Sequence, residues 1–457
     1  MSLRAITYKT VFDIYSRING FQAPQIWQFL EESQWWSSEE IRRFQDENLQ
    51  KLIEYAYRYV PYYRRVMKEQ ELKPKDIQTT DELIKLPVLT KENFRNNWNE
   101  LISTQANSSK TSIRKTGGST GEPLRIMNDY SNGAWENAAF RRGLGFAGCK
   151  LGQPIIQLFG GTLGLAPESF LKKLKAKFSG VVFLPAFEIS HDTVENYVRK
   201  IKQSKAQYLR GYASAIYLLA KIMEDVKLNI SLRAVFPTSE TLHGFQQETI
   251  EKAFQCEVFN QYGCGECNSI AIECTSHNGL HVSDEHVFLE SLKDKERVLD
   301  REMGALTLTT LHNYAMPLIR YQNGDIISLS KALCSCGRSF SRITKIYGRA
   351  NDLLLAKDGR LVSGTFLPSL CVNVDFKGVQ QFQVVQETKD IIHLKVVKTP
   401  RFVESELGPL FEVFQRYLGD VKIEVEYVAS IPRTPQGKLV FVISKFGNKL
   451  LHKEDKK

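Results

Sequence analysis

Residues 114–126 read RKTGGSTGEPLRI and have the types needed to hold a phosphate group. Glycine lets the backbone approach a ligand closely, successive N–H groups form an anion-binding nest, and hydroxyls add donors. The stretch is not a Walker A loop, because Glu122 follows the last glycine where that motif requires lysine. Taken alone, it is typical both of a phosphate cradle and of a turn between strands. The residues that could bind phosphate here are Thr116, Gly117, Gly118, Ser119, Thr120 and Gly121.

Four later segments also carry charged or aromatic residues in short motifs. They are NQYGCGE at 260–266, YQNGD at 321–325, YGRANDLL at 347–354 and PRTPQGKL at 432–439. With residues 114–126, they stand in the order of the motifs of adenylate-forming enzymes, the acyl-CoA synthetases and their relatives, and they resemble them. The wording TGGSTGEP is most similar to the branch with phenylacetate–CoA ligase, coenzyme F390 synthetase and CapK. The N-terminal segments LQKLIEYAYRYVPYYRRVM and LIKLPVLTKENFR also resemble this branch, so the resemblance covers nearly the whole chain.

The resemblance implies an AMP-forming acid–thiol ligase. In this family a carboxylate attacks the α-phosphate of ATP, which gives an acyl-adenylate and pyrophosphate, and an acceptor then displaces AMP. We expect an aryl or related organic acid. The acceptor would be coenzyme A or, in a CapK-like polysaccharide or capsule pathway, an amine or a sugar hydroxyl. The alternative is a non-catalytic relative that binds a nucleotide or acyl-adenylate. Two departures from the family pattern bear on this choice: Gly265 replaces threonine, and Gln322 and Asn323 replace Arg-Thr.

The resemblance also implies a site for ATP and Mg²⁺. Tyr262 would stack on adenine, and Asp325 would accept hydrogen bonds from the ribose hydroxyls. Glu266 would bind Mg²⁺, because that ion prefers hard carboxylate oxygens beside phosphate. Arg349 would assist near ribose or phosphate, and residues 116–121 would hold the pyrophosphoryl end. Further residues expected to line this site are Gly263, Ser239 and Glu240.

The family's catalytic lysine is expected on a separate C-terminal domain. Lys438 in PRTPQGKL matches it, as a mobile point charge that would neutralise the attacking carboxylate and the α-phosphate. The sequence pattern changes near residue 348 to a small α+β unit, so we expect domains at 1–347 and 348–457. The family rotates its small domain between half-reactions about the position of Asn351, which predicts a hinge there.

A second group of residues has the types that bind zinc. Cys274, His281, Cys334 and Cys336 would supply the thiolate and imidazole ligands of a closed tetrahedral structural site. His277 is the rival imidazole. The other interpretation is reduced structural cysteines and surface histidines. Related proteins in the branch that the chain resembles carry similar positions, some of them with zinc.

The spacing of apolar residues along the chain predicts the helices and strands that position these residues. SSEEIRRFQDENLQKLIEYAYRYV predicts a helix with Ser38 as its N-cap, broken at Pro61. From about 110 to 330, apolar runs such as PIIQLF and RAVFPTS alternate with helical segments such as ASAIYLLAKIME. This predicts an α/β fold with a largely parallel sheet, and GALTLTTL and DIISLS predict a more antiparallel, barrel-like part. Among these layers the acid would bind, with candidate lining residues Trp135, Phe140, Phe159, Tyr212 and Phe236.

Composition limits the partners. The 457 residues carry a net charge of +10, which suits anionic ligands such as ATP and coenzyme A. The basic residues are interspersed with acidic ones, so we expect no nucleic-acid partner. No window of about 18 apolar residues exists, so no transmembrane segment is expected. Eight cysteines in a chain of this length do not form a disulfide scaffold, which favours a reducing cytoplasm.

Overall fold

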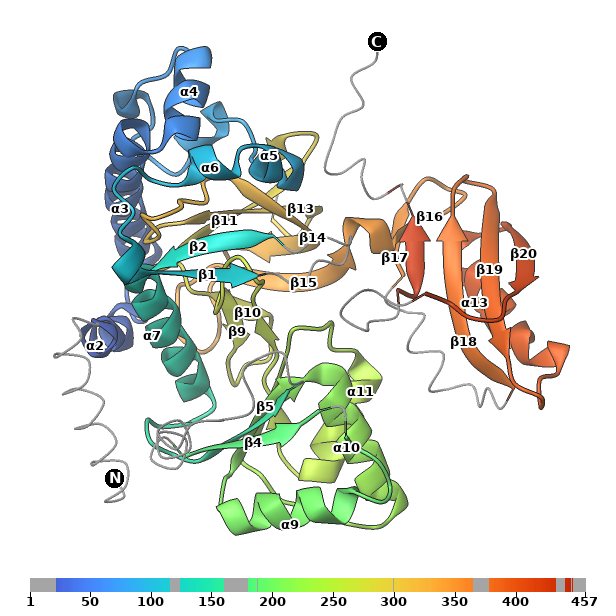
Figure 1. The fold of residues 1–457 in the computed structure, drawn as a ribbon. Helices are drawn as coiled ribbons and strands as arrows, with labels where there is room; N and C mark the ends of the chain where they lie inside the picture. Colours follow the sequence, from blue (N-terminus) through green and yellow to red (C-terminus); the bar gives the residue numbers. More distant parts are fainter. Residues whose placement is uncertain are drawn as a thin grey trace.

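A computed structural model describes most of the chain (Figure 1). The candidate phosphate-binding residues 116–121 and Lys438 lie outside the described residues. Among the helices that are described, none is long and apolar enough to cross a lipid bilayer. The described ranges are 22–115, 124–159, 180–186, 188–298, 300–364, 378–432, 440–444 and 446.

The long N-terminal helix α3 begins at a capping box. The Glu40 N–H donates to the Ser37 hydroxyl (3.2 Å), and the Ser37 N–H donates to the Glu40 carboxylate (2.8 Å). The N-cap is therefore Ser37, and the expectation of Ser38 is wrong because Ser37 is the last extended residue. Pro61 opens the next helix, as expected of a residue without an N–H. The elements of this part are α2 (Ala23–Ser33), α3 (Ser38–Tyr59), α4 (Pro61–Glu69), η1 (Pro74–Asp76), η2 (Glu82–Lys85), α5 (Lys91–Asn96), α6 (Trp98–Leu101) and η3 (Ser108–Lys110).

Five strands form the expected parallel sheet, in the order β4-β3-β5-β6-β7. One face packs on helices α9, α10 and α11 through a core that includes Leu209 and Val235. The other face packs against α7 through Tyr208 and Phe236. Because side chains alternate along a strand, Arg210 lies on the opposite face from Leu209. The elements are α7 (Tyr130–Phe146), β3 (Ile155–Phe159), β4 (Val181–Pro185), α9 (Val194–Ser204), β5 (Tyr208–Tyr212), α10 (Ala213–Asp225), β6 (Ala234–Thr238), α11 (Gly244–Phe254) and β7 (Glu257–Val258).

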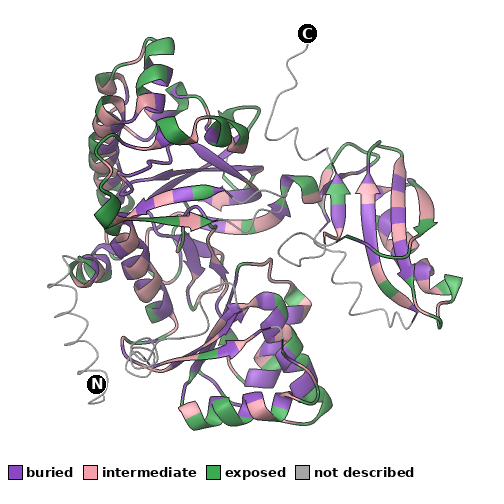
Figure 2. Cartoon of the chain, viewed as in Figure 1, coloured by how far each residue is buried: buried purple, intermediate pink, exposed green. Residues whose placement is uncertain are grey.

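An eight-stranded antiparallel sheet follows, in the order β12-β11-β13-β14-β15-β10-β9-β8. Figure 2 shows that most of its residues are buried. The expected barrel-like part corresponds to this sheet, whose described pairings leave β12 and β8 as edges, so it is open. Its core is shared with α3 and α4. The strands are β8 (Gln261–Tyr262), β9 (Ala271–Glu273), β10 (Leu280–Val282), β11 (Val287–Lys293), β12 (Glu296–Arg297), β13 (Met303–Thr310), β14 (Tyr321–Ser330) and β15 (Arg342–Arg349).

A two-stranded hairpin frames the candidate phosphate-binding residues. Strand β1 (Thr111–Lys115) pairs antiparallel with β2 (Arg125–Asp129). The register ends with Lys115 opposite Arg125, so residues 116–124 connect the two strands.

The C-terminal part has its own sheet, in the order β20-β19-β18-β21, and its own core. Leu394, Leu410 and Phe414 are fully buried in that core. In Figure 1 this part, in orange and red, stands to one side of the rest. The boundary at 348 stays a prediction. The elements are η5 (Ala350–Asp352), β16 (Leu353–Leu355), β17 (Leu361–Ser363), β18 (Val379–Gln386), β19 (Ile391–Lys398), η6 (Glu404–Leu407), α13 (Gly408–Leu418), β20 (Lys422–Tyr427) and β21 (Val442–Ser444).

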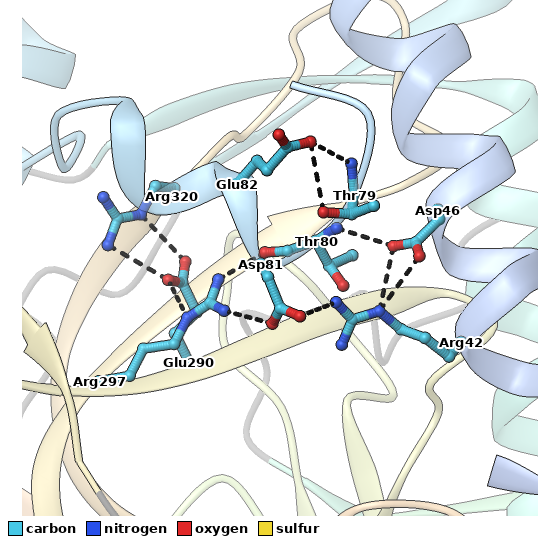
Figure 3. A network of polar contacts seen from close by, with 9 residues as sticks. All are labelled: Arg42, Asp46, Thr79, Thr80, Asp81, Glu82, Glu290, Arg297 and Arg320. Atoms are coloured by element: carbon cyan, nitrogen blue, oxygen red, sulfur yellow. Dashed lines mark hydrogen bonds and ion pairs between the residues drawn. The ribbon is translucent and has the colours of Figure 1, made fainter. Parts of the chain in front are cut away.

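A charged network holds the segment before α5 against the antiparallel sheet (Figure 3). The buried Glu290 carboxylate on β11 accepts from Arg297 at 3.0 Å and from Arg320 at 3.1 Å. Arg297 also reaches Asp81 at 2.9 Å, and Arg42 of α3 reaches the other oxygen of Asp81 at 2.6 Å. The network therefore joins α3, η2 and the sheet.

The same segment then adds to strand β14. Arg320 donates to the carbonyl oxygens of Ile84 and Leu86. Leu89 next forms a parallel bridge with Tyr321: the Leu89 N–H donates to the Arg320 carbonyl (2.9 Å), and the Gln322 N–H donates to the Leu89 carbonyl (3.0 Å). The first residues of α5 are thereby fixed beside the part of β14 that carries the motif YQNGD.

Candidate active site

Three residues from two distant motifs form one hydrogen-bonded group. The Tyr262 hydroxyl on β8 donates to Oδ2 of Asp325 on β14 (2.5 Å). The Asn323 amide donates to that same oxygen (2.8 Å) and to the Tyr262 hydroxyl (2.9 Å). The Asp325 N–H donates to the Asn323 side-chain oxygen (3.0 Å). Asn323, a departure from the family pattern, thus orients the expected ribose-binding carboxylate.

Arg349 faces the other oxygen of that carboxylate. It lies opposite Asp325 in the β14–β15 pairing, with its Nε 3.6 Å from Oδ1. Burial opposes charge on Arg349, but Asp325 and Glu266 raise its pKa, so it stays a cation. Burial and the nearby Asp325 carboxylate raise the pKa of Tyr262 well above its usual value, so its phenol stays a neutral donor.

Glu266 lies close enough to the same site to raise the pKa of Arg349, and only one of its two oxygens accepts a described hydrogen bond. Its Oε1 accepts a hydrogen bond from the buried Tyr321 hydroxyl (2.7 Å). No described residue donates a hydrogen bond to Oε2. The carboxylate is therefore oriented by one oxygen and has the other available, an arrangement that fits a Mg²⁺ ligand beside phosphate.

Lys91 is a member of the site that the sequence did not indicate. Its Nζ is close to Gly324, because a Cβ at that glycine would lie 3.5 Å from it. Burial and Arg349 lower the pKa of Lys91, while Glu266 and Asp325 raise it, so the net direction is downward. Lys91 belongs to LIKLPVLTKENFR, a segment that resembles the family branch but was not assigned to the site, and the bridge between residues 89 and 321 brings it here.

The remaining nucleotide-site candidates, Ser239, Glu240 and Gly263, make no hydrogen bond to this group among the described contacts. The Glu240 carboxylate accepts from the Ser214 N–H at the start of α10 (2.8 Å). Ser239 has a positive φ of 68°. No hydrogen bond joins Ser239 or Glu240 to Tyr262 or Asp325. A Cβ at Gly263 would lie 3.2 Å from the Ser269 backbone nitrogen, so a side chain there would crowd the turn.

The expected hinge residue lies between the two parts of the chain. Asn351 is exposed in the short helix η5, which follows β15 and precedes β16. The Arg349 N–H donates to the Asp352 carboxylate (3.1 Å) at the start of this helix. The connection is therefore short and sits one residue after a strand of the site.

An ion pair and a thiol–imidazole contact lie next to the segment that follows Glu266. Arg114, the residue before the last of β1, forms an ion pair with Glu136 of α7. The Asn268 N–H also donates to Glu136 (3.0 Å). The Cys267 thiol is 3.7 Å from Nε2 of His286, and burial raises its pKa well above the usual value. These contacts fix the backbone that follows Glu266.

The four zinc candidates converge. Their ligand atoms all lie within 4.8 Å of one another. The Sγ atoms of Cys274 and Cys334 are 3.8 Å apart, and Sγ of Cys336 is 3.3 Å from Nε2 of His281. Thiolates at about 2.3 Å from tetrahedral zinc would be about 3.8 Å apart, so the set fits that ion. His277 instead lies 3.7 Å from both Glu257 and Glu273.

Comparison with solved structures defines the class. A 2-hydroxyisobutyryl-CoA ligase, solved in its postadenylation state with an acyl-adenylate, matches with a TM-score of 0.68 over 92% of each chain and 19% identity. The same ligase with 2-HIB-AMP and CoA in its thioesterification state matches with a TM-score of 0.61 and 20% identity, over 92% of this chain and 93% of that one. The protein has the fold of the adenylate-forming CoA ligases.

Sequence comparison then gives the branch. The phenylacetate–coenzyme A ligase of Thermus thermophilus is 25% identical over 85% of this chain and 87% of its own length. Protein CapK of Staphylococcus aureus is 24% identical over 89% of each. Residues 354–445 match the family model of the CapK C-terminal domain. The chain is thus similar in sequence to phenylacetate–CoA ligases and to CapK, which confirms the expected resemblance to both.

Proposed function

We propose that this protein is an AMP-forming ligase that activates a carboxylic acid with ATP. The acid's oxygen would bond to the α-phosphorus, pyrophosphate would leave, and the acyl-adenylate would then react with an acceptor. The observation that carries this proposal is the convergence of Tyr262, Glu266, Asp325 and Arg349 from three separated motifs. The similarity to phenylacetate–CoA ligases supports it and favours it over a non-catalytic nucleotide-binding relative.

Each residue of the group has a role that its geometry permits. Tyr262 would present its ring to adenine while its hydroxyl keeps Asp325 oriented toward ribose. Arg349 and Lys91 would offset the phosphate charge from two sides. Glu266 would hold Mg²⁺, which neutralises phosphate oxygens when bound. Residues 116–121 and Lys438 lie outside the described residues, and their phosphate and carboxylate roles rest on the motifs alone.

Coenzyme A is the acceptor that we propose first. The 2-hydroxyisobutyryl-CoA ligase was solved with 2-HIB-AMP and CoA, and phenylacetate–coenzyme A ligases are among the relatives. The match to CapK keeps a role in capsule or polysaccharide synthesis, with an amine or a sugar hydroxyl as acceptor, as the second candidate.

We also propose that residues 348–457 move as a unit about Asn351. The separate core of this part and the short η5 connection support such a motion. The motion would carry Lys438 to the site for adenylation and away from it for acyl transfer. We propose that the reaction takes place in the cytoplasm, where ATP and coenzyme A are available. The described cysteines are all free thiols, which fits a reducing compartment.

A structural zinc ion is the remaining part of the proposal. Zinc would tie the Cys334–Cys336 turn to β9 and β10 through Cys274 and His281. Metal analysis of the purified protein should give one zinc per chain, and Cys336→Ser should lose it. Absence of stoichiometric zinc from the wild-type protein rejects this site without affecting the ligase proposal.

Carboxylate-dependent ATP–pyrophosphate exchange across a panel of acids tests the function. We expect exchange with at least one acid, and its loss in Lys438→Ala, because that lysine would no longer neutralise the attacking carboxylate. Glu266→Gln keeps an oxygen for Tyr321 but should lower exchange about 100-fold or more, since Mg²⁺ loses its carboxylate. ATP binding without exchange for any acid supports the non-catalytic relative instead.

A further inference from the structure

Arg210 is a guanidinium held between aromatic rings beside the candidate active site. It is the central residue of β5, the middle strand of the parallel sheet, two residues before Tyr212 at the carboxyl end of that strand. Its Cζ is 4.8 Å from the ring centroid of Phe140 on α7 and 5.2 Å from that of Phe159 on β3. Its Nε donates to the Gln261 side-chain oxygen (2.8 Å). Gln261 immediately precedes Tyr262, so one short strand joins Arg210 to the nucleotide-binding group.

Arg210 has a positive charge that no described residue balances. Three other buried or half-buried arginines of this region and the neighbouring sheet face carboxylates: Arg114 pairs with Glu136, Arg142 with Glu285, and Arg320 with Glu290. The buried Arg342 has no described carboxylate partner either, but its terminal nitrogens donate to the carbonyl oxygens of Asn278 and Ala332. The single described hydrogen-bond partner of Arg210 is a neutral amide. Burial lowers its pKa to about 10, so it remains charged at neutral pH.

The other N–H donors of Arg210 remain available. A guanidinium has five N–H donors, and Gln261 takes the one on Nε. No described protein group accepts from the two terminal nitrogens. The side chain is only partly buried, so solvent reaches it. A cation that is partly removed from water, has no acid partner among the described residues and keeps its two terminal nitrogens open is suited to bind an anionic ligand.

The surroundings point to the acyl part of the substrate. Of the aromatic residues expected to line the acid site, Phe140 and Phe159 flank Arg210, and Tyr212 packs edge-on against Phe159 with centroids 5.1 Å apart. The other two lie elsewhere: Trp135 stacks on His312 at 3.7 Å, and Phe236 is fully buried against Phe259. Ligands in open parallel sheets bind at the carboxyl ends of the strands, where Phe159 and Tyr212 lie.

We propose that Arg210 binds a second anionic group of the substrate acid, so that the substrates are dicarboxylic acids or acids with an equivalent anion. This inference rests on the proposed function, because it assigns the acid whose first carboxylate is activated. The rings of Phe140 and Phe159 fix the guanidinium plane and give an apolar wall to the carbon skeleton between the two anions. The second carboxylate receives two parallel N–H donors from the open fork.

Matched pairs of acids test this selectivity in the exchange assay. Each diacid is compared with the monoacid in which a methyl group replaces the second carboxylate. The pairs are adipate with hexanoate, glutarate with pentanoate, and 4-carboxyphenylacetate with 4-methylphenylacetate. In the wild-type protein we expect kcat/KM to favour the diacid of at least one pair. Loss of a charged hydrogen-bonding partner corresponds to about 10- to 100-fold.

Variants assign the preference to Arg210. Arg210→Gln should abolish the preference for the diacid and leave the monoacid within about threefold, while Arg210→Lys should restore part of it, because lysine keeps the charge without the bidentate fork. Arg199→Gln, which removes one exposed positive charge from α9, should retain the wild-type preference. Thermal unfolding of each variant, and calorimetric binding of adipate to the wild-type protein and Arg210→Gln in the presence of AMP, separate a folding defect from lost recognition.

Each outcome of these assays supports or overturns the proposed role of Arg210. A wild-type protein that exchanges with monoacids as well as with diacids overturns the inference and leaves the ligase proposal standing. An equal loss for every acid in Arg210→Gln also overturns it, because Arg210 would then act on the reacting carboxylate or on the fold. Exchange with none of the acids overturns the ligase proposal and this inference together.

Discussion

Two cations flank the carboxylates of the candidate site. Arg349 reaches Asp325 at 3.6 Å, and Lys91 lies beside Gly324 with Glu266 and Asp325 acting on its charge. Lys91 is partly buried, so its charge is less screened and should interact with ATP more strongly than that of an exposed lysine would. Arg349 comes from the end of β15 and Lys91 from the start of α5, so the two cations belong to different elements.

Lys91→Met should therefore impair the reaction without disturbing the fold. Methionine keeps the length and apolar stem of lysine but removes the charge. We expect kcat/KM for ATP in the exchange assay to fall about 10- to 100-fold. Lys85→Met is the matched control, because Lys85 pairs with Glu82 on the surface at 2.9 Å and should leave exchange unchanged. Equal activity of Lys91→Met and the wild-type protein would remove Lys91 from the site.

At this scale the sequence indicates residue types and not their partners. Tyr262, Glu266 and Asp325 stand in motifs, so they were predictable. Lys91 was not, because the resemblance of LIKLPVLTKENFR to the family branch does not show that this segment reaches the site. Arg210 was missed because it belongs to none of the motifs, and only coordinates show its aromatic neighbours and that none of the described residues supplies an acid partner.

Buried pairs decide how the elements are held together. Glu290 on β11 is almost fully buried and serves both Arg320 and Arg297 (Figure 3). Arg320 in turn fixes the segment that delivers Lys91. Breaking a buried pair is costly, because one charge is left without compensation in a medium that solvates it poorly.

Glu290→Gln should destabilise the protein by about 3–5 kcal/mol in denaturant unfolding, because Arg320 stays buried without its carboxylate. Asp81→Asn, at the exposed end of the same network, should cost less than about 1 kcal/mol. Similar losses for the two variants would mean that the network does not hold the segment in the way described.

Buried histidines make stability depend on pH. Burial and the nearby His286 lower the pKa of His312 to about 3, below its unfolded value of about 6.5. Between those values the unfolded chain binds the extra proton, so stability is present above about pH 6.5 and is lost as pH falls toward 3. His312 stacks on Trp135 and its Nε2 lies 2.8 Å from the Glu285 carbonyl oxygen, so it is held neutral.

His312→Gln should flatten that dependence. One proton fewer is taken up on unfolding, so the slope of unfolding free energy between pH 7 and pH 5 should decrease by up to about 1.4 kcal/mol per pH unit. Denaturant titrations at three pH values measure it, and glutamine can still donate to the Glu285 carbonyl. The same slope in the variant and the wild-type protein would show that His312 is charged in the folded state.

The elements themselves were largely predictable from the sequence. Helix α10 and strands β3 and β6 fall on the predicted segments, because apolar periodicity records which face is buried. The Ser37 cap was missed by one residue, since two serines are adjacent and only backbone geometry selects between them. The bridge between Leu89 and Tyr321 was not predictable, because it joins residues more than 200 positions apart and follows from tertiary packing.

The whole molecule consists of a large body and a C-terminal part joined through η5. The body carries Tyr262, Glu266, Asp325 and Arg349, whereas Lys438 belongs to the C-terminal sequence. An enzyme with this division needs a change of arrangement between its two half-reactions if both use the same acyl-adenylate. The fold class was predictable from the order of motifs, but the sequence does not reveal how the two parts sit.

Stiffening the connection should separate the two half-reactions. Asn351→Pro fixes φ at that residue and restricts Ala350 before it. We expect ATP–pyrophosphate exchange to change less than about threefold and acyl transfer to slow by about tenfold or more. Asn351→Ala is the control, since it keeps ordinary backbone freedom. Equal effects on both half-reactions would contradict a hinge at this position.

The central claim is that the acid's own oxygen bonds to the α-phosphorus of ATP. A single experiment tests it. The protein is incubated in ordinary water with ATP, an acceptor and an acid labelled with ¹⁸O in its carboxylate. The mass of the nucleotide product is then measured by mass spectrometry. We predict AMP that carries one ¹⁸O atom, formed by the wild-type protein and not by Lys438→Ala. Unlabelled AMP would contradict adenylation of the acid. Formation of ADP, with the label in inorganic phosphate, would contradict it as well.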